Sequence, residues 1–171
     1  MTGTPEKNEA APYYFRYIDR VVTDDIVGFL QTQLEGAEAL LAGISQEKSL
    51  HRYAPEKWSI RQVLNHVTDT ERMFLSRALW FARGFQDPLP SFEQDIAAAG
   101  AAADECSWSY HVEEFRTVRL ASHAFFRNMP AAGWTRAGVA SGNRFTVRAI
   151  AWIVAGHYSH HASILRERYL Q

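Results

Sequence analysis

Disulfide bonds are the first stabilising device that this sequence lacks. Its 171 residues include a single cysteine, Cys106, so no disulfide can form within the chain. A lone cysteine is typical of proteins from a reducing compartment, and we expect a cytoplasmic protein. Cys106 stands in a connecting region and is a poor candidate for a catalytic nucleophile.

Long apolar runs and an excess of one charge are also missing. The longest apolar stretches, such as 149–156, are far shorter than the roughly 20 residues that cross a bilayer, and the polar N-terminus has no apolar signal core. Eighteen Lys and Arg against nineteen Asp and Glu give a net charge of −1, without a basic stripe. We therefore expect no membrane association and no nucleic-acid partner.

The composition that remains is that of a folded globular domain. Hydrophobic residues make up 47% of the chain, and five Trp, seven Tyr and ten Phe argue against disorder. The length fits one domain with a core of its own. We expect residues 1–12 to form a flexible tail and residues 13–171 to form the domain.

Four stretches have the apolar spacing of amphipathic helices. They are 23–44, 59–83, 107–128 and 145–169. Their predicted N-caps are Thr23, Ser59 in a capping box with Gln62, Ser107 or Ser109, and Thr146. No segment shows the alternation of a β-strand, and 131–145 is expected to be a connection with a turn at 141–144. The small-residue stretch 96–103 fits either a helical turn or a crossover. Four long helices in one domain predict an all-α four-helix bundle.

The last predicted helix carries a group of histidines. His157 and His161 are four residues apart, which places both imidazoles on one face of a helix, one turn apart. Two such rings can bind one metal ion, and His66, beside the apolar stripe of the second helix, is the candidate third ligand. Three protein ligands with the remaining positions open describe a catalytic rather than a closed structural site. The spacing alone also fits histidines held by ordinary hydrogen bonds, and His160 competes with His161 through its i,i+3 spacing from His157.

Two motifs resemble those of the DinB-like superfamily. Residues 58–71, from Trp58 to Glu71, are similar to its second-helix signature, and 157–165 are similar to its last-helix signature, a histidine followed by a His-His pair. The resemblance covers about 13–168. It implies an up-down-down-up four-helix bundle, often homodimeric, with zinc or nickel on three histidines that match His66, His157 and His161.

The resemblance also implies a class of function. Relatives include S-transferases that use bacillithiol or mycothiol and a mycothiol-dependent maleylpyruvate isomerase, in which the metal is thought to activate the thiol of the cofactor. The expected function is therefore a metal-dependent enzyme that activates a low-molecular-weight thiol, or water, against a small-molecule electrophile. The alternative is a non-catalytic metal-binding stress-response protein.

Two acidic residues follow His66 on the predicted second helix. Asp69 lies one turn from His66 and has two interpretations, a second-shell carboxylate that orients a ring or a solvated acid. Glu71 lies off that face and is expected to form an ion pair. The remaining histidines, His51, His111 and His123, have no spacing that pairs them with the cluster and are expected to be structural.

Overall fold

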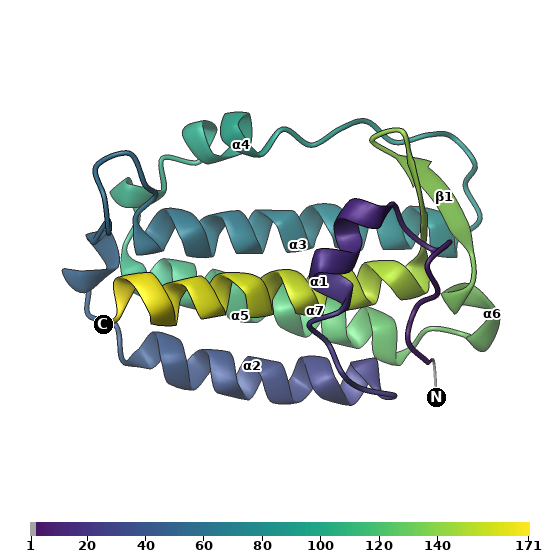
Figure 1. Ribbon diagram of the computed structural model, residues 1–171, viewed down its shortest axis with the longest axis horizontal. Coiled ribbons are helices and arrows are strands. Elements are labelled where there is room, and N and C mark those ends of the chain that lie inside the picture. Colours follow the sequence, from purple (N-terminus) through teal and green to yellow (C-terminus); the bar gives the residue numbers. More distant parts are fainter. Residues whose placement is uncertain (1–2) are drawn as a thin grey trace.

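A computed structural model describes residues 3–171, and its main body consists of four long α-helices (Figure 1). These are α2 (Ile26–Ala42), α3 (Ile60–Ala82), α5 (Trp108–Arg127) and α7 (Val147–Ile164), the last continued by a π-helical turn, Leu165–Tyr169. Short α-helices are α1 (Phe15–Ile18), α4 (Gln94–Gly100) and α6 (Ala131–Trp134). Short 3₁₀ turns are Pro12–Tyr14, Lys48–Leu50 and Ala103–Glu105.

The four long helices run up, down, down and up, as predicted. In Figure 1, α2 and α7 point in one direction, and α3 and α5 point in the other. Because α3 and α5 are parallel, the chain returns between them through a long crossover, and α4 lies within it along α3. The stretch 96–103 is thus a helical turn inside a crossover. Within residues 3–171, no helix combines the length and the apolarity needed to span a bilayer.

Most predicted helix ends are confirmed. Ser59 and Gln62 form a reciprocal capping box, and Ser107 and Thr146 accept hydrogen bonds at the starts of α5 and α7. The prediction of Thr23 as the first N-cap is wrong. Asp25 accepts from the backbone N–H of Gly28 and begins α2, while the Thr23 hydroxyl is bonded to the backbone of Asp25.

A β-hairpin corrects the expectation that the chain has no strands. Strands β1 (Ala137–Ala140) and β2 (Asn143–Thr146) pair antiparallel, so Ala137 faces Thr146 and Ala140 faces Asn143. The turn between them was predicted, and Ser141 and Gly142 both have positive φ, of 52° and 71°, as a tight hairpin turn requires. Each strand is only four residues long, too short for an alternating pattern to be recognised.

Part of the expected N-terminal tail is packed against the bundle. Glu9 is 5% exposed, and its carboxylate accepts hydrogen bonds from the Thr146 hydroxyl and the Arg148 guanidinium at the start of α7. An acidic group at this end of a helix complements the helix dipole. Residues 1 and 2 lie outside the described residues.

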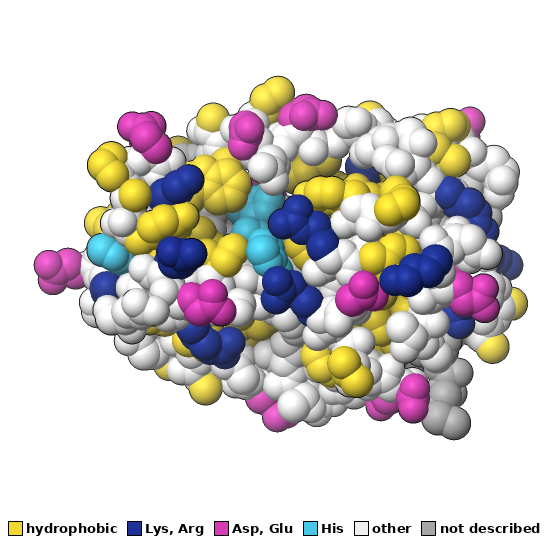
Figure 2. Space-filling view, viewed as in Figure 1, with side chains coloured by type: hydrophobic (Ala, Val, Ile, Leu, Met, Phe, Trp, Pro, Cys, Tyr) yellow, Lys and Arg dark blue, Asp and Glu magenta, His cyan; other side chains and the backbone are white. Residues whose placement is uncertain are grey.

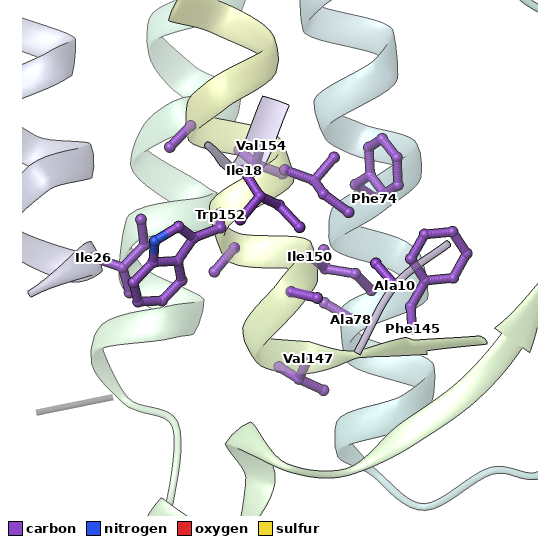
Figure 3. Packing of buried hydrophobic residues seen from close by; sticks show 14 of the residues in the cluster. Ala10, Ile18, Ile26, Phe74, Ala78, Phe145, Val147, Ile150, Trp152 and Val154 are labelled. Atoms are coloured by element: carbon purple, nitrogen blue, oxygen red, sulfur yellow. The ribbon is translucent and has the colours of Figure 1, made fainter. Parts of the chain in front are cut away.

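Helix α7 lies at the centre of the core. Its residues 149–158 are all buried, as expected for a helix that is apolar on every side. Figure 3 shows Trp152 pointing toward Ile26 of α2, while Ile150 and Val154 point to the other side, toward Ala78 and Phe74 of α3. This packing fixes α7 against α3, the two helices that carry the candidate site.

Candidate metal centre

The structure brings the three predicted histidines together. His66 is on α3, His157 and His161 are on α7, and the ring centroids are 5.0 Å, 5.0 Å and 4.6 Å apart. One nitrogen from each ring lies within 4.8 Å of the others, and no other described residue joins this group. We call these three residues the histidine cluster.

One distance within the cluster matches that of two imidazoles bound to the same metal ion. The Nε2 atoms of His66 and His157 are 3.2 Å apart. Two imidazole nitrogens bound to one tetrahedral ion at about 2.0–2.1 Å would be about 3.3–3.4 Å apart. The donor set is also chemically suitable, since imidazole is a good ligand for zinc and nickel.

Burial keeps the three imidazoles neutral. It lowers the pKa of His66 to about 4 and that of His161 to about 3, where the neighbouring histidines and Arg16 add to the effect. The pKa of His157 is lowered well below its usual value, first by burial and then by the histidines around it and Arg119. A neutral ring offers a lone pair, so the cluster is ready to bind a cation at neutral pH.

Aromatic rings enclose the cluster, and sequence reasoning did not assign them to the site. Trp58 lies against His66 with ring centroids 5.0 Å apart, and Tyr17 of α1 lies edge-on to His157 at 5.2 Å. Tyr17 also contacts His160 at 5.6 Å, and the His160 ring lies 5.1 Å from that of His161 without adding a nitrogen to the group of three. Trp58 directly precedes the capping box, so its place at the start of the second helix can be read from the sequence. No local pattern assigns Tyr17 to the site, because Tyr17 and His157 are 140 residues apart in sequence.

Thr70, rather than Asp69, is the residue of α3 that stands behind His66. The Thr70 hydroxyl lies 3.5 Å from His66 Nδ1. Asp69 instead accepts a hydrogen bond from Arg72 at 3.1 Å, in an ion pair on the helix surface. No contact between the Asp69 carboxylate and an imidazole is found among the described residues.

The other histidines have separate positions. Nε2 of His111 is hydrogen-bonded to the carbonyl of Ala103, 2.8 Å away, and the His51 ring packs edge-on to Tyr169. His123 lines a surface groove between α2 and α5. None of them reaches the cluster.

A second set of buried polar groups lies beside the cluster, and we call it the Arg119 network. Arg119 of α5 is fully buried and donates to both carboxylate oxygens of Glu71 on α3. It also donates to Gln33 of α2, whose amide in turn donates to the Ala155 carbonyl and the Ser159 hydroxyl of α7. The ion pair predicted for Glu71 is confirmed. Through Gln33, the Arg119 network joins all four long helices.

Two cavities flank the histidine cluster. One, of about 260 Å³, is lined by His66 and His157 and by the rings of Tyr13, Tyr14 and Tyr17, with α4 on its other side. The other, of about 220 Å³, reaches His161 between Trp58 and Tyr169. Figure 2 shows histidine side chains reaching the surface in the middle of one face, bordered by hydrophobic and by Lys or Arg side chains. Small molecules can therefore approach the imidazoles from solvent.

The fold is a helical bundle in which three imidazoles from two helices converge. The chain belongs to the DinB superfamily, whose family model matches residues 30–165. A search of the curated proteins returned no significant match.

Solved structures share the fold at low sequence identity. YfiT from Bacillus subtilis, described as a probable metal-dependent hydrolase with an unusual four-helix bundle topology, is 13% identical with a TM-score of 0.71. That match covers 85% of this chain and 89% of YfiT. The mycothiol-dependent maleylpyruvate isomerase is 10% identical with a TM-score of 0.69, and the match covers 83% of this chain but 60% of the isomerase.

Proposed function

We propose that the protein is an enzyme that holds a divalent metal ion, zinc or nickel, on His66, His157 and His161. In this proposal it activates a low-molecular-weight thiol, or water, for attack on a small electrophile. A divalent ion supplies positive charge that lowers the pKa of a thiol or of water and polarises a carbonyl. The observation that carries the proposal is the convergence of three neutral imidazoles, two buried and one half-buried, beside cavities that open to solvent.

The chain's own residues have separable tasks in this proposal. The Thr70 hydroxyl, behind His66 Nδ1, favours one tautomer and one orientation of that ring. Trp58 and Tyr17 cover the rings and limit the access of water. Burial raises the pKa of Tyr14 and of Tyr17, so both hydroxyls stay protonated and serve as hydrogen-bond donors to a ligand in the cavity.

An open site favours an enzyme over a closed structural metal site. Only three ligand residues converge in the part of the chain that the structure describes, and neither His160 nor Asp69 supplies a fourth. Catalytic sites of this kind leave positions for an exchangeable ligand. The relation to a hydrolase-like protein and to a thiol-dependent isomerase agrees with both thiol and water as that ligand.

Metal content is the first test. Tag-free protein purified without chelator is expected to contain about one zinc or nickel ion per chain by elemental analysis, and His66→Ala and His157→Ala are expected to lose it. His160→Ala is the matched control and should keep the metal. With free metal at about 1,000 times its Kd, the free energy of unfolding should rise by about 4 kcal/mol. A wild-type protein that is empty and cannot be loaded would overturn the proposal.

Catalysis is tested separately. Metal-loaded protein is assayed with bacillithiol, mycothiol and glutathione against a chromogenic electrophile, and for hydrolysis of activated esters. We expect a rate that is lost in His157→Ala and on removal of the metal. A metal-loaded protein inactive in every assay would favour the non-catalytic metal-binding alternative. We also propose a cytoplasmic homodimer, which sedimentation analysis of the purified protein and fractionation of the cells would test.

A further inference from the structure

One edge of the cavity beside His66 and His157 is made of aromatic rings, and an arginine packs on two of them. Tyr13, Tyr14 and Tyr17 come from the N-terminal turn and α1 and line the cavity. The guanidinium carbon of Arg16 lies over two of these rings, 5.2 Å from the centroid of Tyr13 and 5.4 Å from that of Tyr17. Arg16 is thereby held at the rim.

A second arginine lies next to the first. Arg20 is one turn further along and donates through Nε to the carbonyl of Arg16 at 3.2 Å. Both side chains are exposed, and neither is within ion-pair distance of a carboxylate among residues 3–171. Their charges reach the site, since both act electrostatically on His160 and Arg16 also acts on His161. Two arginine charges without carboxylate partners thus stand at the edge of the candidate metal centre.

The position of these arginines is fixed by the close packing of α1 on α7. A Cβ atom added to Gly156 would lie 2.0 Å from the carbonyl oxygen of Tyr17, so only glycine permits this contact. Gly156 directly precedes His157, and the backbone that carries Arg16 and Tyr17 is therefore tied to the backbone that carries the cluster. The rim is a built part of the site rather than a loose surface segment.

We propose that the ligand of this site is anionic, with a carboxylate or a similar group bound by Arg16 and Arg20 while its reacting end lies at the histidine cluster. This inference rests on the proposed function, because it names the class of thiol or substrate that the metal centre takes. Guanidinium groups are suited to the planar, two-point recognition of carboxylates. Their exposure also lets the pair attract an anion before it enters the cavity.

The opposite edge of the cavity has the opposite charge. Glu93 lines it from just before α4, and Asp95 of α4 acts electrostatically on His66. An anionic group is therefore repelled from the α4 side and directed to the α1 side. The ligand is expected to have an orientation as well as a charge, with its negative end toward Arg16.

The test uses two thiols of equal length that differ in charge. Full-length protein loaded with cobalt(II) is titrated with 3-mercaptopropionate and with its neutral amide, 3-mercaptopropanamide, and the thiolate-to-cobalt absorption band is followed. We expect wild type to bind the carboxylate about tenfold more tightly, in line with one charged hydrogen bond. Arg16→Gln/Arg20→Gln is expected to bind both thiols equally. Arg83→Gln is the matched control, an exposed arginine over the ring of Phe125 at 5.8 Å and away from the histidines.

The outcomes separate the two proposals. A wild-type protein that binds cobalt and both thiols without preference would overturn the anionic ligand and leave the metal-dependent function standing. A preference that persists in the double variant would overturn the role of Arg16 and Arg20. A protein that takes up no cobalt would overturn the proposed function and this inference together. Circular dichroism of each variant confirms that the fold is intact.

Discussion

The histidine cluster and the Arg119 network are both sets of polar groups inside one bundle. They differ in how far their polar atoms are paired with partners from the protein. Arg119 and Glu71 neutralise each other, and Gln33 passes the remaining hydrogen bonds to α7. The imidazoles of the cluster instead point nitrogens at one another, with one pair 3.2 Å apart. The hydrogen bonds of the first set are completed by protein groups, whereas the second set brings three ring nitrogens close to one point.

This difference separates structural from functional polar groups. Buried charges persist in a folded core when they are paired and hydrogen-bonded, as those of Arg119 and Glu71 are. The neutral imidazoles of the cluster share only weak contacts of this kind and are well arranged for a cation. We therefore expect the Arg119 network to affect stability most and the cluster to affect ligand binding most.

The largest expected effect on stability comes from breaking the ion pair. Arg119→Met leaves the Glu71 carboxylate buried, at 3% exposure, without its cation. We expect the free energy of unfolding in urea to fall by about 3–5 kcal/mol. Arg119→Met/Glu71→Leu removes both charges and is expected to recover most of the loss. A loss below about 1 kcal/mol in the single variant would mean that the network contributes little.

The cluster is expected to make the metal-free protein sensitive to acid. The pKa of His66 is lowered from 6.5 to about 4 and that of His161 to about 3, so between pH 6.5 and pH 4 the unfolded chain binds protons that the folded chain does not. This contribution to stability is complete above pH 6.5 and is lost as the pH falls, by about 1.4 kcal/mol per pH unit for each imidazole. Urea unfolding at several pH values measures the slope. His66→Leu/His161→Leu should have a shallower slope, and an unchanged slope would contradict the assignment.

Metal affinity is expected to respond differently to changes at Thr70 and at Asp69, the two residues of α3 considered as partners of His66. Thr70→Val removes the hydroxyl near Nδ1 at nearly constant volume and is expected to weaken metal binding about tenfold, as measured by competition with a chelator. Asp69→Asn is the control, since Asp69 pairs with Arg72 at the surface, and its effect should be about twofold at most. A larger effect of Asp69→Asn on metal affinity would show that the Asp69 carboxylate acts on the histidine cluster.

Local sequence patterns predict the helices and two of the candidate metal ligands. The capping box at Ser59 and the caps at Ser107 and Thr146 are short-range signals that the structure confirms. The i,i+4 spacing of His157 and His161 follows directly from the helical period. At the first helix Thr23 and Asp25 are both of a good N-cap type, and the structure uses Asp25, which accepts from the backbone N–H of Gly28.

Local sequence patterns do not predict the contacts between different helices of the bundle. His66 meets His157, 91 positions away, only through the register of α3 against α7. Its place beside the apolar stripe made His66 a candidate ligand, and the resemblance supported that choice. Arg119 carries a charge on the buried face of α5, and its burial depends on Glu71 of another helix. The strands of the hairpin are too short for periodicity, and Tyr17 reaches the site because Gly156 lets α1 approach α7. These features depend on tertiary packing, which local propensity does not encode.

The smallest expected effect on stability is that of His157→Leu in the metal-free protein. The variant loses the contact with Nε2 of His66, worth about 1 kcal/mol as a hydrogen bond. It also replaces a buried polar ring with an apolar side chain of similar size, a change that favours the folded state. The two terms oppose each other, so urea unfolding with chelator present should change by about 1 kcal/mol or less, while metal binding is lost. A loss as large as that of Arg119→Met would mean that the histidines hold the bundle together, and the division between the two buried groups would fail.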